Sequence, residues 1–381
     1  MDTAAKPGTL QMIADFSNAK APSGFEEETI AAARKHIGCG YETEEDCLRN
    51  FYMYRKANTG KKPVFMLDAH SDEVGFMVHS IRPNGTLRFV ALGGWNVSAL
   101  PSTKVLVRNK HGQYIPGIIA AKPVHFMTEA EKHSSNTEIS ALSIDIGALD
   151  AEDAVKNFGI RIGEPIVPDV TMEYDETHDL LFGKAFDCRI GCAAMLEALH
   201  RLENEGLDVD VVGVLSSQEE VGERGMKVAV GHAKPDIAIC FEGCPADDTF
   251  TEPYAVQTAF KKGPMLRFMD KSIICSPRYQ RYALDLAEEK GIPVQASVRE
   301  GGGNNGAIVN TALDGVPTIV IGVPVRYIHT VYGIASIYDF EATVRLAVEL
   351  VKSMTAEDRN NADRHFHKFQ RLHSVKFHPG V

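Results

Sequence analysis

The chain has 381 residues, of which 44% are hydrophobic and 24% are charged, and its formal net charge is -11. This length favours two domains, and the composition is that of an ordinary globular protein. The acidic balance argues against nucleic-acid binding, which needs basic clusters, and no apolar run approaches the roughly 20 residues of a membrane span. Because Met1–Asp15 has no apolar core and the seven cysteines are scattered, we expect a cytoplasmic protein without a secretory signal.

The chain begins with a helix and a strand. Ser23 and Glu26 stand at the spacing of a capping box and predict a helix through about Ile37. A short apolar strand, Val64–Leu67, then runs into the polar block His70–Gly75. Ligands in α/β proteins bind beyond the carboxyl ends of such strands, so this block is a candidate for a functional site.

From about Phe76 the pattern changes to that of an antiparallel β-domain. Asn84-Gly85 and Asn109–Gly112 are turn signals between segments of alternating hydrophobicity, such as Leu87–Val90 and Val105–Val107. Few helical periods interrupt this region. We therefore predict a small β-barrel or sandwich inserted in the chain.

An alternation of strands and helices resumes near Phe182. Apolar runs predict strands at Phe182–Phe186, Val209–Leu215, Ile237–Phe241, Val294–Ser297 and Pro317–Ile321. Amphipathic periods predict helices at Arg189–Leu202, Arg278–Lys290 and Asp339–Met354. The predicted fold class is therefore α/β, with a mixed, mostly parallel sheet flanked by helices and an inserted small barrel.

Titratable side chains follow the ends of the predicted strands. Those at or just beyond a strand end are His70, Asp187, Glu219, Glu220, Glu242 and His329. Because parallel strands place their carboxyl ends on one edge, these side chains can converge despite their distance in sequence. Histidines and carboxylates together suit zinc, cobalt or manganese, and two ions about 3.5–4 Å apart that share a carboxylate form a hydrolytic centre.

The same residue types also permit structural interpretations. Glu219 and Glu220 alone fit a solvated loop, and a single histidine is more often an ordinary core or surface residue than a ligand. His70 is favoured because Asp72 can accept its second ring N–H and fix its tautomer. Histidines without such support are discounted, namely His79, His111, His125, His178 and the tail residues His365, His367, His373 and His378. The cysteines without Cys-x-x-Cys spacing are expected to be buried packing residues, namely Cys188, Cys192, Cys240 and Cys244.

Five segments, in order, resemble the family of cobalt and zinc aminopeptidases that includes glutamyl aminopeptidases, deblocking aminopeptidases and tetrahedral (TET) peptidases. The segments are Pro22-Ser23-Gly24-Phe25-Glu26, His70-Ser71-Asp72-Glu73-Val74-Gly75, Asp187-Cys188-Arg189, Gln218-Glu219-Glu220-Val221-Gly222-Glu223-Arg224-Gly225 and Arg326-Tyr327-Ile328-His329. Each is weak alone, but the ordered set spans nearly the whole chain and is highly specific. Some members of this family carry the older label endoglucanase M.

The resemblance implies a zinc-peptidase-like catalytic α/β domain, residues 1–75 and 169–381, interrupted by a dimerisation β-domain, residues 76–168. It implies two divalent ions per chain, Zn²⁺ or Co²⁺, and cleavage of the N-terminal bond of peptide substrates through a metal-bridging water. Assemblies from dimer to dodecamer are implied as well. Carried over by position, the resemblance implies that His70 and Glu242 bind one ion, that Glu220 and His329 bind the other, and that Asp187 bridges the two. It also implies that Asp72 orients His70 and that Glu219 is the general base.

The sequence departs from the family pattern at three places. Glu242 replaces a usual Asp and keeps the charge, and Cys188 replaces a usual Asn or Asp. The stretch Gly301–Ala307 resembles a segment that usually reads Gly-Gly-Thr-Asp-Ala-Gly-Ala, so Asn304 replaces an Asp in a loop expected to line the pocket or the amine site. We therefore expect neutral or acidic N-terminal residues to be favoured over Lys and Arg, unless this loop only shapes a turn.

Other functions stay open at this point. A related dinuclear carboxypeptidase or deacylase shares the ligands but binds the other end of its substrate. A non-catalytic accessory protein of carbohydrate metabolism is the third candidate, although it has no need of an intact Glu219. The endoglucanase label is disfavoured, because glycosidases need two free carboxylates that flank a bond and not a metal cage.

Overall fold

The centre of the protein is a mixed sheet covered by helices on both faces. The computed structural model describes residues 7–129 and 138–354. Within them, eight strands form the main sheet, in the order β1 (Tyr41–Glu45), β2 (Phe51–Arg55), β12 (Asp210–Ser216), β3 (Val64–His70), β13 (Ile237–Pro245), β16 (Thr318–Val325), β14 (Met265–Met269) and β15 (Gln295–Val298). The four middle strands, β12 to β16, are parallel to one another. Their carboxyl ends therefore share one edge of the sheet.

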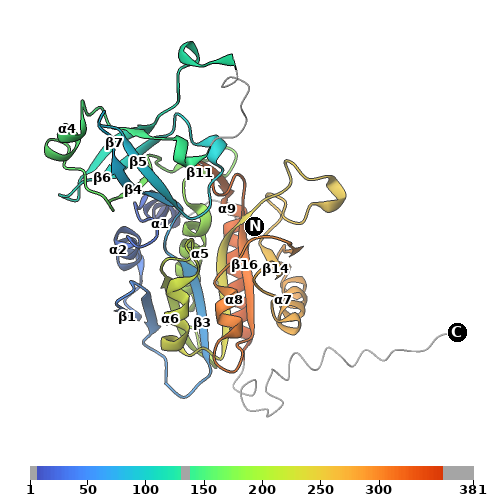
Figure 1. Ribbon diagram of the computed structural model, residues 1–381. Helices are drawn as coiled ribbons and strands as arrows, with labels where there is room; N and C mark the ends of the chain where they lie inside the picture. The colour runs from blue at the N-terminus through green and yellow to red at the C-terminus, as the bar shows by residue number, and fades with distance from the viewer. Residues whose placement is uncertain (1–6, 130–137, 355–381) are drawn as a thin grey trace.

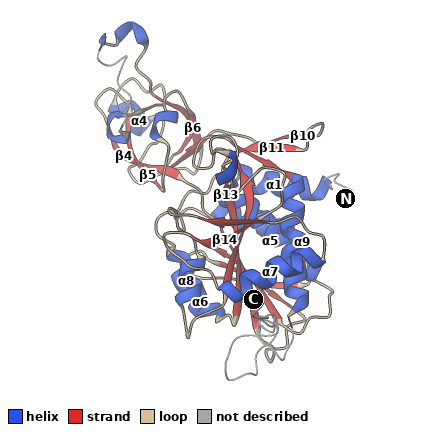
Figure 2. Ribbon diagram, turned by 90° about the vertical axis from the view of Figure 1, so that its right-hand side faces the viewer, coloured by secondary structure: helices blue, strands red, loops and turns tan. Residues whose placement is uncertain are grey.

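The helices divide between the two faces of this sheet (Figure 2). One face packs against α1 (Pro7–Asn18), α2 (Glu27–His36), α5 (Phe186–Leu202), α7 (Pro277–Glu289) and α9 (Ile337–Ser353). The other face packs against α6 (Arg224–Ala233) and α8 (Gly306–Thr311). Helix α5 is buried along almost its whole length because α1 and α9 cover its outer side. Burial on both faces explains why the central strands are continuous apolar runs.

A closed barrel lies at one end of this sheet (Figure 1). Its strands follow the order β4 (Gly75–Ile81), β5 (Leu87–Leu92), β8 (Ile144–Asp145), β7 (Tyr114–Ile119), β6 (Lys104–Arg108) and β9 (Pro165–Pro168). The short helices of this region are η1 (Val97–Ala99), η2 (Val124–Phe126), η3 (Ile139–Ala141) and α4 (Ala151–Lys156). Inward-facing side chains such as Leu87 and Phe89 fill the interior, and closure leaves no free strand edge. The predicted α/β fold with an inserted barrel is confirmed.

A third, smaller sheet corrects one predicted strand. It consists of β10 (Glu173–Asp175), β11 (Leu180–Gly183) and β17 (Gly333–Ser336). The predicted strand Phe182–Phe186 is wrong, because β11 ends at Gly183 and Phe186 already begins α5. Backbone pairing with β17 fixes β11 outside the main sheet.

The predicted capping box at Ser23 and Glu26 is also wrong. Helix α2 begins at Glu27, and Glu26 at its N-cap makes no side-chain cap hydrogen bond. Ser23 Oγ instead donates to Asp72 Oδ2 at 2.6 Å. Glu26 Oε1 accepts from the backbone N–H groups of Gly24 at 2.7 Å and Gln218 at 3.1 Å. Both side chains therefore serve a tertiary contact near the carboxyl edge of the sheet.

Several elements were not predicted, among them helices α1, α6 and α8 and strands β1, β2 and β14. The short helix η4 (Pro253–Ala255) lies in the long connection after β13. No helix among the described residues is long and apolar enough to cross a membrane. The predictions about His365, His367, His373 and His378 concern residues outside the described part of the chain.

Candidate metal centre

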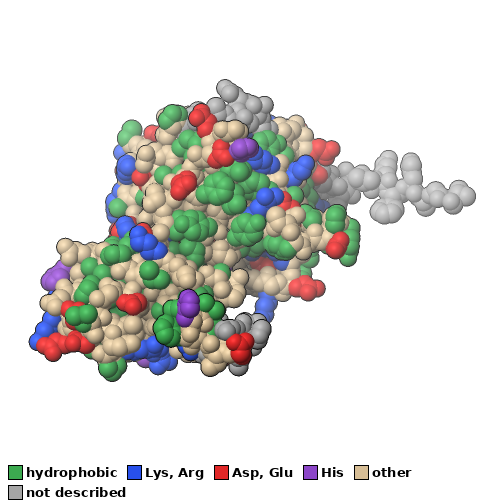
Figure 3. All heavy atoms as spheres, turned by 90° about the horizontal axis from the view of Figure 1, so that it is seen from above, with side chains coloured by type: hydrophobic (Ala, Val, Ile, Leu, Met, Phe, Trp, Pro, Cys, Tyr) green, Lys and Arg blue, Asp and Glu red, His purple; other side chains and the backbone are tan. Residues whose placement is uncertain are grey.

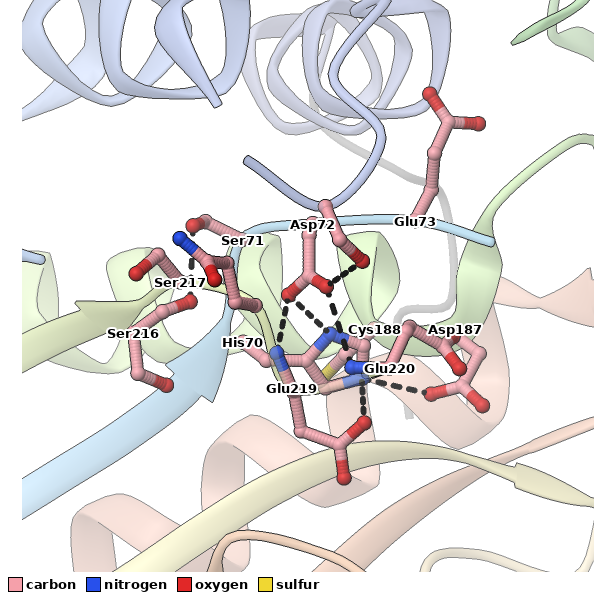
Figure 4. Close-up of polar contacts among 12 residues, drawn as sticks. His70, Ser71, Asp72, Glu73, Asp187, Cys188, Ser216, Ser217, Glu219 and Glu220 are labelled. Atoms are coloured by element: carbon pink, nitrogen blue, oxygen red, sulfur yellow. Dashed lines mark hydrogen bonds and ion pairs between the residues drawn. The ribbon is translucent and has the colours of Figure 1, made fainter. Parts of the chain in front are cut away.

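All six proposed ligand and base side chains meet at the carboxyl edge of the main sheet. Figure 4 shows His70, Asp187, Glu219 and Glu220 close together there. His70 is the last residue of β3, and Glu219 and Glu220 follow β12 in the next turn. Two positions differ from the prediction that each residue follows a strand end. Glu242 lies inside β13, which continues to Pro245, and Asp187 lies in the first turn of α5.

Asp187 lies between the two histidines. Its Oδ1 is 3.1 Å from His70 Nε2, and its Oδ2 is 3.0 Å from His329 Nε2. The backbone at Asp187 has a ψ of 109°, and Cys188 is non-helical as well, so the helical geometry of α5 is interrupted at these two residues. A carboxylate with one oxygen toward each histidine has the arrangement of a bridge between two cations.

Two further carboxylates complete the cluster on either side. Glu242 Oε2 is 3.8 Å from His70 Nε2, and Glu220 Oε1 is 3.6 Å from His329 Nε2. Candidate ligand atoms of His70, Asp187 and Glu242 all lie within 4.8 Å of one another, as do those of Asp187, Glu220 and His329. Glu220 Oε1 is buried and has no hydrogen-bond partner among the described residues. These donor atoms fit two divalent ions of the kind that histidine and carboxylate ligands hold.

The electrostatics also favour a cation. Burial raises the pKa of Glu219 to about 8 and the pKa values of Glu220 and Glu242 well above their usual range. Burial lowers the pKa of His329, but Asp187 and Glu220 outweigh it and raise this pKa to about 10. Without a cation, Glu219, Glu220 and Glu242 therefore keep their protons to a higher pH than free carboxyl groups do. A divalent cation in the cluster would offset the repulsion between their charged forms and would replace those protons.

Asp72 connects the His70 side of the cluster to the loop after β12. Its Oδ1 is 3.4 Å from His70 Nδ1 and accepts the backbone N–H of Glu219 at 2.9 Å. Its Oδ2 accepts the backbone N–H of Glu220 at 3.2 Å as well as the Ser23 hydroxyl. Asp72 is fully buried, so it holds both the histidine ring and the Glu219–Glu220 turn in fixed positions.

The barrel contributes a contact that sequence reasoning missed. His329 Nδ1 donates to the carbonyl oxygen of Gly94 at 2.8 Å, and Gly94 lies in the loop after β5. His329 itself has a φ of 56°, in the left-handed region. The adjacent glycines at 93 and 94 were the available signal, since glycine permits close backbone approach.

Cys188 has a candidate ligand atom near His70, Asp187 and Glu242. However, its Sγ donates to the carbonyl oxygen of Phe241 at 3.1 Å, and burial raises the pKa of this thiol well above its usual range. A thiol that is committed to a backbone acceptor in this way is a packing residue and not a ligand. Four more cysteines are buried, namely Cys192, Cys240, Cys244 and Cys275, as expected for the first three.

A cavity of about 860 Å³ opens beside the cluster. Asp187, Glu219 and His329 line it, and Gly301–Gly303 form another part of its wall. The expectation that the glycine-rich loop lines the pocket is therefore confirmed for Gly301, Gly302 and Gly303. It is wrong for Asn304, which is fully buried and accepts the backbone N–H of Gly306 at 2.8 Å.

The chain is similar to known peptidases over most of its length. The family model for M42 glutamyl aminopeptidase matches residues 50–346. The glutamyl aminopeptidase of Lactococcus lactis is 32% identical over 339 residues, which are 89% of this chain and 94% of that relative.

Two solved structures show the same fold. The TET aminopeptidase of a marine sediment Thaumarchaeota archaeon is 33% identical with a TM-score of 0.86, and the match covers 92% of this chain and 98% of that one. The TET1 peptidase of Pyrococcus horikoshii, described as assembling into a tetrahedron or a large octahedral shell, is 26% identical with a TM-score of 0.81. That match covers 91% of this chain and 100% of the other. By sequence and fold, the chain is a peptidase and belongs to the M42 glutamyl aminopeptidase family.

Proposed function

We propose that this aminopeptidase removes N-terminal residues from peptides at a centre that holds two divalent ions per chain, zinc or cobalt. The observation that carries this proposal is Asp187, whose two oxygens lie 3.1 and 3.0 Å from His70 and His329. In this assignment His70, Asp187 and Glu242 bind the first ion, and Asp187, Glu220 and His329 bind the second.

Bound divalent ions supply Lewis-acid polarisation of the scissile carbonyl and a water that loses its proton near neutral pH. Glu219 is the base that accepts this proton and passes it to the leaving amine. Its Oε2 lies 4.0 Å from His70 Nε2, so its carboxylate borders the ligand cluster. Its backbone is fixed by Asp72, and the cavity reaches it.

A chelator experiment combined with product analysis tests this function. Dialysis against a chelator abolishes hydrolysis, and Zn²⁺ or Co²⁺ restores it. Mass spectrometry of a peptide of mixed sequence shows stepwise shortening from the N-terminus. Full turnover in metal-free protein contradicts the metal centre, and shortening from the C-terminus favours the related carboxypeptidases instead.

We also propose that residues 76–168 form a domain through which copies of this chain associate. Several barrel side chains that are large and apolar face solvent, among them Phe126, Leu149 and Ile162 at 73%, 87% and 70% exposure. The view from above shows hydrophobic side chains at several points of the surface, among charged ones (Figure 3). Exposed apolar side chains of this size are candidates for an association surface. Light scattering that gives a monomer at working concentration contradicts this proposal.

A cytoplasmic location is part of the same proposal. All seven cysteines are unpaired thiols, which suits a reducing compartment.

A further inference from the structure

The turn that carries His329 lies between β16 and β17 and is held in a strained conformation. Tyr327 and His329 have φ values of 63° and 56°, both in the left-handed region that residues other than glycine rarely adopt. Such residues persist only where the surrounding structure fixes them. Because His329 is a proposed ligand of the second ion, the contacts that fix this turn also fix the ligand.

Arg326 stands at the base of this turn. It follows the last residue of β16, and its backbone exchanges two hydrogen bonds with Ile334 of β17, at 3.0 and 3.1 Å. This backbone pairing closes the turn three positions before His329. The side chain of Arg326 then joins the closed turn to another part of the protein.

That part is the long connection after β13. Arg326 Nε donates to Asp248 Oδ1 at 3.1 Å, and Nη2 donates to Asp248 Oδ2 at 2.7 Å. The guanidinium also lies over the ring of Phe260, with Cζ 4.6 Å from the ring centroid. Exposed ion pairs usually contribute little, but bidentate pairing and stacking together give this guanidinium one defined orientation.

Asp248 is itself held in place by the connection. Its Oδ2 also accepts the backbone N–H of Phe260 at 3.1 Å. Asp247, beside it, accepts the backbone N–H of Thr258 at 3.0 Å and lines the cavity next to the metal centre. These bonds close the connection on itself, so the ion pair ties the turn to a defined part of the cavity wall.

The barrel supports the same turn from another side. In addition to the bond from its ring to Gly94, His329 accepts the backbone N–H of Asn96 at its carbonyl oxygen, at 3.4 Å. His70 depends on β3 and Asp72 instead. Loss of the ion pair is therefore expected to act on one half of the metal centre only.

We propose that Arg326 and Asp248 are positioning residues for His329, and that their ion pair sets the affinity of the second metal site. This inference rests on the proposed function, since that function defines the second site. Both residues act through the turn and not as ligands.

Calorimetric titration of metal-free protein with Zn²⁺ tests this inference. We expect two ions per chain in the wild type. Arg326→Met raises the Kd of the second site by roughly 10–100-fold, the effect of losing a residue that orients a ligand, and leaves the first site unchanged. Arg326→Lys has a smaller effect, because it keeps the charge without the bidentate geometry. Asp248→Asn is also milder, because it keeps an oxygen for the backbone N–H of Phe260.

Arg201→Met is the matched control. Arg201 donates to both carboxylate oxygens of Glu341 at 2.7 Å, and its side chain is 28% exposed, against 29% for Arg326. This pair joins α5 to α9, and neither of its residues lines the cavity. Its loss lowers the Tm but leaves both metal sites unchanged. Equal weakening of the second site in Arg201→Met and Arg326→Met means a general loss of stability and overturns the inference.

Protein that carries His329→Ala tests the assignment to one site. There Arg326→Met has no further effect on the remaining site, because the ligand that the ion pair positions is absent. A further loss in this protein, or a wild-type Kd at the second site in Arg326→Met alone, overturns the inference. If Arg326→Met does not fold, Arg326→Lys and Asp248→Asn serve in the same titrations. A wild type that binds fewer than two ions contradicts the proposed function instead.

Discussion

The two histidines of the candidate centre are held in different ways. His70 is 1% exposed, ends a central parallel strand, and lies beside the buried Asp72. His329 has a 35% exposed side chain, lies in a turn after β16, and donates to a carbonyl oxygen of the barrel. One half of the centre therefore belongs to the rigid interior of the sheet, and the other half depends on contact between the sheet and the barrel. We expect the half of the centre that contains His329 to bind its ion more weakly than the half that contains His70.

Asp187 joins both halves, and its loss has the largest expected effect. Asp187→Ala removes a ligand from both proposed ions and leaves the buried carboxylates without a bridge. Activity falls by more than the roughly 10²–10⁴-fold that general-base loss produces. Metal analysis finds less than one ion per chain, whereas retention of two ions means that Asp187 does not bridge.

A change at Glu219 tests whether catalysis can be lost while both metal sites are retained. Glu219→Gln keeps the size and the hydrogen bonding of the side chain but cannot accept a proton, so kcat falls by roughly 10²–10⁴-fold. Metal content stays that of the wild type. If the variant loses metal instead, Glu219 is a ligand and Glu220 is the candidate base.

Asp72 tests the His70 half. Asp72→Asn removes the charge beside His70 Nδ1 but retains an oxygen that can accept from the backbone of Glu219. Loss of a residue that orients a metal ligand costs about 10–100-fold in metal affinity or activity. Titration with Zn²⁺ shows weaker binding at one of two sites, and unchanged binding at both contradicts the assignment.

Gly93 tests the half that depends on the barrel. A Cβ at this position lies 2.7 Å from Val74 Cγ1 and 3.1 Å from Glu220 Oε2, and the φ of 81° disfavours any side chain. Gly93→Ala therefore displaces the loop and weakens one metal site, with an effect smaller than that of Asp72→Asn. Gly94→Ala is the matched control with the weaker effect, because its Cβ meets His329 Nδ1 at an ordinary 3.5 Å. Equal effects of the two variants contradict a role for loop position.

The smallest expected effect is on stability against pH. Without metal, the folded-state pKa of Glu219 is raised from 4.5 to about 8 and that of His329 from 6.5 to about 10. At a pH between the unfolded-state and the folded-state pKa of each group, the folded state binds more protons than the unfolded state. The stability of metal-free protein therefore falls as pH rises from about 5 to 9. Bound ions replace these protons. The Tm difference between loaded and metal-free protein therefore widens with pH, and a constant difference contradicts the account.

The part of the centre that the sequence predicts well is the part built on parallel strands. His70, Glu219 and Glu220 follow apolar runs directly, and neighbouring parallel strands bring such positions together. Asp187 lies within the cluster, but the strand that was predicted before it was wrong, because β11 pairs with β17 and not with the main sheet. The barrel was predictable from alternating hydrophobicity.

The contacts that sequence reasoning missed are non-local. The adjacent glycines at 93 and 94 are compatible with a loop, but they do not show that it reaches His329, 235 positions after Gly94. Arg267 of β14, which lines the cavity, was missed because a short strand that contains an arginine gives no apolar run. Asp270 accepts from Asn304, 34 positions later, through a contact that exists only in the folded chain. The local pattern at Asn304 indicated a turn or a pocket residue and could not decide between them.

The most direct test of the dinuclear centre is anomalous scattering at the zinc and cobalt absorption edges, from crystals of protein loaded with each metal. We predict two peaks about 3.5–4 Å apart, one beside His70 and Glu242 and the other beside Glu220 and His329, with Asp187 in contact with both. A single peak in fully loaded protein, or two peaks of which only one contacts Asp187, contradicts the assignment.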